Sequence, residues 1–293
     1  MNNFQLKSIA VIFLLINTSI SAQDFQGKAV YQSKTNIEMD LSGSGIPADR
    51  IKMIQERMKN QLEKTYVLTF NKTASIYKEE EKLDQAGGPS GGGMRMIMIG
   101  GSGTGKHYKN TQTKTSAKEN ELSGKNFLIK DDLITYDWKM EQETKMIGEN
   151  LCFKATTVIQ RPKRTTNFRF GRGRDNNNNE AENNEEEKAP EMEDVIVTAW
   201  YAMDIPVGHG PGDYWGLPGL ILEISDGNTQ ILCTKIVLNP KEKTEITEPK
   251  KGKVVTQEEY DVIQEEKMKE MRERMGNERQ KGGNEGHRIR IGG

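Results

Sequence analysis

Apolar and polar residues alternate over many short stretches of the chain, and this two-residue period predicts β-strands. Turn residues such as Asn71-Lys72 and Asp226-Gly227-Asn228 separate several of these stretches, as in β-hairpins. The expected strands cover residues 25–39, 66–70, 74–78, 107–115, 125–130, 134–139, 143–147, 151–160, 195–201, 220–225 and 229–238. Short strands at this spacing favour an antiparallel sheet.

Two segments follow the helical period instead. In residues 47–64 apolar residues recur at spacings of three and four: Ile51, Ile54, Met58 and Leu62. From about Thr256 the chain is highly charged and predicts a solvated helix with a sparse apolar stripe of Val262, Met268 and Met271. The expected class is α+β: a curved, mainly antiparallel sheet of about 8–11 strands, like a half-barrel, with one packed helix and a charged C-terminal helix.

Residues 1–22 have the pattern of a signal peptide. Lys7 precedes the apolar run Ile9–Ile16, and small residues follow as far as Ser21-Ala22. The run is shorter than the roughly 20 apolar residues of a membrane-spanning helix. We expect cleavage after Ala22 and a mature protein in the periplasm, on the cell surface or secreted. The alternative is an uncleaved anchor.

Composition limits the size of the folded core. Apolar residues make up 34% of the chain and charged residues 29%, which is less apolar than an ordinary globular protein. We therefore expect a single domain over 23–255, with disordered insertions near 81–105 and 161–194, followed by a charged helix and Gly/Arg-rich tail over 256–293. The net charge of -1 predicts no general attraction to nucleic acid, and no other segment is apolar enough for an integral membrane protein.

The two cysteines, Cys152 and Cys233, allow three interpretations. An oxidising compartment favours a disulfide between them. Two free buried thiols are the second alternative. A catalytic thiol is the least favoured, because it needs a neighbouring base or cation that the sequence does not reveal.

A Gly-rich segment offers two candidate chemistries. Residues 100–106 have the G-x-x-x-x-G-K spacing of a phosphate-binding loop, but His107 stands where that loop needs a hydroxyl group, and no helix pattern follows. We therefore interpret it as a Gly-rich loop. Just before it, Met94, Met96 and Met98 would share one side of a strand, and thioethers favour Cu(I). With His107 they are weak candidates for a copper site, and the alternative is the apolar face of a strand.

Evidence for catalysis is sparse. The chain has no nucleophile elbow of the form G-x-S-x-G. His209 lies in a loop of glycines and prolines, Gly208–Gly212, that is expected to be exposed. It is the best-placed candidate base, but it is interpreted more simply as a solvent-facing histidine. We expect no enzyme activity and no cofactor.

The segment from Thr198 to Glu223 is the most informative part of the chain. It carries four aromatic residues among glycines and prolines that impose tight turns, and it ends in the apolar strand 220–225. Such a loop either caps the core or forms an apolar binding mouth. The candidate ligand-binding residues are Trp200, Tyr201, Tyr214, Trp215 and Leu217.

The same segment resembles a known family. Gly216-Leu217-Pro218-Gly219-Leu220-Ile221 spells the motif of the GLPGLI family of Bacteroidota proteins, and Thr198–Tyr201 and the stretch around Cys152 and Lys154-Ala155-Thr156 are also similar to it. Asn150 and Leu151 depart from the family pattern. The resemblance implies export by a Bacteroidota bacterium. The family has no assigned biochemical role, so it supplies no catalytic residue.

These observations favour a non-enzymatic periplasmic binding or envelope-accessory protein. Its partner would be an apolar ligand, a polypeptide segment or an envelope protein, held near the aromatic loop. The alternative is a periplasmic copper-handling protein that uses the Met-rich segment. The oligomeric state is left open.

Overall fold

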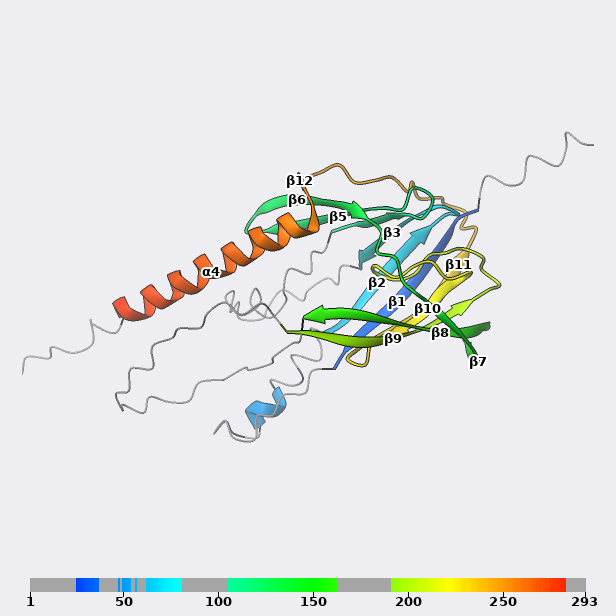
Figure 1. Ribbon diagram of the computed structural model, residues 1–293, viewed down its shortest axis with the longest axis horizontal. Helices are drawn as coiled ribbons and strands as arrows, with labels where there is room; N and C mark the ends of the chain where they lie inside the picture. Colours follow the sequence, from blue (N-terminus) through cyan, green and yellow to red (C-terminus); the bar gives the residue numbers. More distant parts are fainter. Residues whose placement is uncertain are drawn as a thin grey trace, which may run out of the picture. The chain divides into compact units, whose positions relative to one another are not determined.

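The structure is a computed structural model, and it describes residues 25–36, 47, 49–53, 56, 62–80, 105–162 and 191–282. The described residues form twelve strands and one long helix, α4, with further helical residues at 49–53, 56 and 62 (Figure 1). The expected signal peptide, most of both expected insertions and the tail after Gly282 lie outside the described residues.

The first six strands are β1 (Gly27–Thr35), β2 (Glu63–Phe70), β3 (Ala74–Glu79), β4 (His107–Asn110), β5 (Thr115–Leu122) and β6 (Lys125–Asp132). The remaining elements are β7 (Lys139–Ile147), β8 (Asn150–Pro162), β9 (Met192–Ala202), β10 (Leu220–Ser225), β11 (Thr229–Leu238), β12 (Lys253–Val255) and α4 (Gln257–Gly282).

The expected α+β class is wrong, because the fold is mainly β. The expectation depended on a helix over 47–64 that buries an apolar stripe against a sheet. In the part of this segment that the structure describes, residues 49–53, 56 and 62 are helical, and of the expected stripe Ile51 and Leu62 are half-buried rather than part of a buried core. Ile54 and Met58 lie outside the described residues. The strand number also exceeds the expected 8–11, since β5 and β12 are too polar or too short to show the two-residue period.

Two strand boundaries differ from the sequence pattern for local reasons. The expected strand 107–115 is divided into β4 and the start of β5 by a turn over 111–114, where Lys114 adopts a positive φ of 57°. The expected strand 134–139 is an extended connection, and β7 begins only at Lys139. In this connection Tyr136 packs on Tyr214 of the loop before β10, and Trp138 packs against the core cluster that contains Tyr201.

The chain divides into two compact units. The larger comprises 1–82, 110–113 and 134–247, and its strands have the order β3-β2-β1-β11-β10-β9-β8-β7. All the pairings described within this order are antiparallel. The hairpin β2–β3 and the hairpin β10–β11 confirm the two turn predictions.

Both faces of this unit carry buried apolar residues. One cluster contains Tyr31, Phe70, Cys152, Ala202 and Leu222, and Trp200 packs against it. The other contains Val197, Ala199, Tyr201, Leu217 and Ile221. Trp200 and Tyr201 are neighbours in β9, so the two clusters lie on opposite faces of this strand. We call these the Trp200 face and the Tyr201 face.

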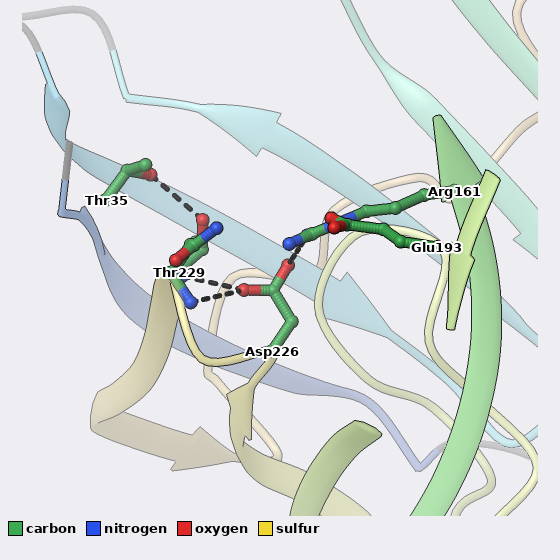
Figure 2. Close-up of polar contacts among 6 residues, drawn as sticks. Thr35, Arg161, Glu193, Asp226 and Thr229 are labelled. Atoms are coloured by element: carbon green, nitrogen blue, oxygen red, sulfur yellow. Dashed lines mark hydrogen bonds and ion pairs between the residues drawn. The ribbon is translucent and has the colours of Figure 1, made fainter. Parts of the chain in front are cut away.

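A charged network ties the β10–β11 turn to the β8–β9 pair (Figure 2). The carboxylate of Asp226 accepts the backbone N–H of Thr229 at 2.7 Å through Oδ1. Its Oδ2 accepts a hydrogen bond from Nη1 of Arg161 at 2.8 Å, while Nε of Arg161 lies 3.2 Å from Oε1 of Glu193. Gly227 has a φ of 84°, which the turn requires and a glycine adopts without strain.

The smaller unit comprises 83–109, 114–133 and 248–293. In it β5 and β6 form an antiparallel hairpin, and β12 pairs with β6 in parallel. Helix α4 begins after Thr256, whose Oγ1 accepts the N–H of Glu259 while the Glu259 carboxylate accepts the N–H of Thr256. Tyr260 packs edge-on against Phe127 at 5.5 Å, which anchors the first turn on β6.

Candidate functional site

The aromatic loop between β9 and β10 is internally hydrogen-bonded. His209 and Trp215 form an antiparallel bridge, and the N–H of Gly216 donates to the carbonyl of Gly208 at 3.0 Å. The N–H of Ile221 donates to the carbonyl of His209 at 3.0 Å. Because its backbone groups are paired in this way, the loop has a defined shape and covers part of the Tyr201 face.

Indole groups join this loop to the connection before β7. Nε1 of Trp215 donates to the carbonyl of Ile134 at 2.7 Å, and Nε1 of Trp138 donates to the carbonyl of Trp215 at 2.9 Å. The ring of Tyr136 lies 5.4 Å from those of Trp138 and Tyr214. These contacts match the first of the two alternatives for the aromatic loop, a cap over the core.

The G-L-P-G turn has a structural explanation at each of three positions. Gly216 has a φ of 94°, which favours glycine. Leu217 is 2% exposed and fills the core on the Tyr201 face. A Cβ atom on Gly219 would lie 2.1 Å from the carbonyl oxygen of Ala202, so only glycine fits there. The motif therefore specifies a packed turn.

His209 is placed differently from the expectation. The sequence predicted an exposed loop, but the imidazole is fully buried. Its Nε2 lies 3.0 Å from the carbonyl oxygen of Asn71, and its ring lies 6.1 Å from that of Phe70. The histidine thus links the loop to the β2–β3 hairpin, and burial withdraws it from a substrate.

The five candidate binding residues do not form one site. Tyr201 and Leu217 are buried on the Tyr201 face, and Tyr214 packs against them. Trp215 is half-buried in the loop. Trp200 lies on the opposite face, half-buried at the edge of the other core cluster.

Sequence reasoning missed two charged residues next to Trp200. Nζ of Lys145 lies 2.6 Å from Oε2 of Glu223 and 4.2 Å from the centre of the Trp200 ring. Gln230 donates to the other oxygen of Glu223 at 3.1 Å. Glu223 is 7% exposed, and a buried carboxylate is stabilised only when its charge is compensated. The sequence did contain a signal for this site, because Glu223 is the one charged residue within the apolar run of β10.

A register shift in β10 positions this carboxylate. Ile221 pairs with Tyr201 and Glu223 pairs with Trp200, so Leu222 is the extra residue of a bulge. Leu222 belongs to the same core cluster against which Trp200 packs. Consecutive strand residues normally point to opposite faces, but the bulge places both Leu222 and the carboxylate of Glu223 on the Trp200 face.

From Trp200 a strip of side chains runs along the same face of β8 and β9. Cross-strand partners are Lys154 with Trp200, Thr156 with Thr198 and Val158 with Ile196. Val158 is 57% exposed and Ile196 is 66% exposed. We call these six residues the Trp200 strip. It changes from charged and aromatic at one end to apolar at the other.

Lys154 has two carboxylate partners on β7. Its Nζ lies 2.9 Å from Glu143 and 3.0 Å from Glu141. Hydrogen bonds to Glu143 and Glu141 raise the pKa of Lys154. The ammonium group therefore stays charged over the whole physiological pH range.

The cysteines are free thiols in the structure, both buried in the cluster that borders Trp200. Burial is the main cause that raises the pKa of each thiol to about 11. A thiol with this pKa is almost entirely protonated near pH 7, so neither residue is an activated nucleophile. The structure matches the second of the three interpretations.

The Met-rich candidate lies mostly outside the described residues. Met94, Met96 and Met98 are not described, and His107 is half-buried on β4. Within the described ranges, no three His, Cys, Asp or Glu side chains come together in an arrangement that could hold a metal ion. In the same ranges, no helix is both long and apolar enough to cross a membrane.

Residues 138–223 match a family model described as "Protein of unknown function (Porph_ging)". No curated protein matches the chain. Among solved structures, PNGF-II in space groups C2 and P21 is similar, with TM-scores of 0.47 and 0.46 and identities of 11% and 12%. The similarity covers 82% and 81% of this chain but 32% of each PNGF-II chain, so this chain spans about a third of their length.

Replacement of Gly219 by alanine should destabilise the protein by about 2–4 kcal/mol. The new methyl group would collide with the Ala202 carbonyl, which is backbone and cannot rotate away. Urea unfolding of the purified protein measures the effect. Gly208→Ala in the same loop is the matched control, because its nearest atom would be 3.6 Å away, and it should leave the unfolding midpoint nearly unchanged. Equal effects of the two changes would contradict the collision.

The two thiols should be inert in the folded protein at pH 8 and react fully in denaturant. Because the pKa of each buried thiol is about 11, its contribution to stability is present below pH 9 and decreases as the pH rises toward 11. Mass spectrometry after alkylation, with and without guanidinium, measures how many of the two cysteines are alkylated. Two labels in denaturant confirm free thiols, whereas none would show the disulfide interpretation to be correct.

Proposed function

We propose that the chain is an exported, non-enzymatic binding or envelope-accessory protein of the GLPGLI type from a Bacteroidota bacterium, acting in the periplasm or on the cell surface. The signal-peptide pattern of residues 1–22 supports export. The match of residues 138–223 to a family domain of unknown function supports the relationship, because this range includes the G-L-P-G turn.

The ligand-contacting surface in this proposal is the Trp200 strip, in place of the aromatic loop. The observation that carries it is the exposure of Val158 and Ile196, which are directly opposite each other and continue the face on which Trp200 lies. Neighbouring exposed apolar side chains reduce solubility, and they are common at binding surfaces. Tyr201 and Leu217 are needed in the core and offer no such surface.

The charge at the other end of the strip indicates what kind of ligand fits. Lys145 is paired with one carboxylate and Lys154 with two, so this end of the strip lies beside charges of both signs and an aromatic ring. A ligand that places an apolar stretch over Val158 and Ile196 and a polar group beside Trp200 would match it. We propose an amphipathic molecule or an apolar polypeptide segment of an envelope protein.

Native mass spectrometry of the protein purified from its own envelope fraction tests this function. The wild type should carry an additional lipid or peptide mass, and Ile196→Lys should lose it because a charge would replace the apolar contact. Val237→Lys on β11 is the control, since Val237 is also exposed, at 37%, and lies outside the strip.

A wild-type protein without added mass, or equal loss in both variants, would contradict the proposed surface. A copper mass that disappears when Met94, Met96 and Met98 are changed to leucine would favour the metal-handling alternative instead. That alternative stays a prediction, because these methionines lie outside the described residues.

A further inference from the structure

The smaller unit contains a groove that the proposed function does not use. It has a volume of about 380 Å³ and lies between β12 and the first turns of α4. The lining residues are Lys253, Val254, Val255, Glu259, Val262 and Ile263. Val254 is 59% exposed and Val262 is 57% exposed, so the aliphatic part of the wall is accessible, while Lys253 and Glu259 add one charge of each sign to the lining.

One side of the groove is a strand edge. In the strand order, β12 is terminal, and within the described residues it pairs with β6 alone. A terminal strand presents unpaired backbone N–H and carbonyl groups to any extended segment that approaches it. Extended peptides bind such edges through the backbone and place alternate side chains in adjacent pockets.

The charges around the groove indicate what kind of peptide segment would bind there. Between Gln257 and Glu266, α4 carries five acidic residues and no basic one. The acidic residues are Glu258, Glu259, Asp261, Glu265 and Glu266. An occupant with aliphatic side chains for the groove and basic side chains for this helix face would be complementary in both respects.

One segment of this chain has that pattern. His287-Arg288-Ile289-Arg290-Ile291 alternates basic and aliphatic residues, so in an extended conformation Ile289 and Ile291 share one side. We propose that this segment binds as an added strand along β12, with its isoleucines against Val254 and Val262 and its arginines near the acidic start of α4.

The length of α4 indicates which copy supplies the segment. From Val262 to Gly282 the helix rises about 30 Å, at 1.5 Å per residue. From Gly282 to Ile291 a fully extended chain spans about 31 Å at most. The segment of the same chain would reach the groove only if it were completely straight, whereas the segment of a second copy is free of this limit. The occupant is therefore a second copy's 287–291, exchanged reciprocally in a twofold dimer.

The test compares self-association of four proteins by sedimentation over a range of concentrations. The mature chain should form dimers, while a chain that stops at Gly282 and Val262→Lys should stay monomeric. Val237→Lys is the matched control, because Val237 is also an exposed valine, at 37%, but belongs to the larger unit and lies outside the Trp200 strip. It should dimerise like the wild type.

A synthetic peptide of residues 283–293 separates specific docking from general association. Titrated into the chain that stops at Gly282, the peptide should bind, and Val262→Lys in that chain should weaken binding at least tenfold. Circular dichroism checks that α4 is retained in each variant. A mature chain that is monomeric throughout, or a peptide that fails to bind the shortened chain, would overturn the proposal.

Discussion

At the start of β10 the backbone of Gly219 lies so close to the carbonyl of Ala202 that a Cβ atom would be 2.1 Å from the oxygen. This approach sets the pairing of Leu220 with Ala202, from which the register of β9 and β10 follows. The bulge at Leu222 and the placement of Glu223 opposite Trp200 depend on that register. The steric constraint in the turn therefore sets where the pairing of β9 and β10 begins, and the bulge at Leu222 sets which side chains lie opposite each other beyond it.

The same register has an electrostatic consequence. A carboxylate at the position of Glu223 must give up most of its hydration, since the residue is 7% exposed. Lys145 and Gln230 together bind both of its oxygens, so the loss of hydration is offset by an ion pair and a hydrogen bond. Breaking such a pair costs more than never forming it, because the remaining charge stays buried alone. The group is thus a fixed feature at the boundary between the core and the exposed strip.

The fold was predictable from sequence where the local pattern and the tertiary environment agree. In β11 the expected range 229–238 is the observed one, because the turn at Asp226-Gly227-Asn228 defines its start. The pattern failed for β12, which has three residues and is a strand only because β6 lies beside it. It also failed for 134–139, where the alternation reflects aromatic packing of Tyr136 on Tyr214, 78 residues later in the chain.

The candidate site shows the same division. The aromatic residues and glycines of the loop indicated a binding site. In the structure, however, Leu217, Tyr201 and His209 are buried and belong to the packing of the protein. Composition alone cannot distinguish this packing role from a binding role. No single residue type marks Val158 and Ile196, since each is an ordinary strand residue. Their significance depends on register, which places them opposite each other, and on exposure, which the sequence does not contain.

Packing explains the G-L-P-G turn, and charge compensation explains the contacts of Glu223, but nothing in the described structure requires Val158 and Ile196 to face solvent. A family motif built from packing constraints identifies a fold and says little about a ligand. Residues that the fold leaves exposed despite their apolar character carry more information about binding than the motif itself. For this chain, function is therefore better sought on the Trp200 strip than in the turn that makes the sequence recognisable.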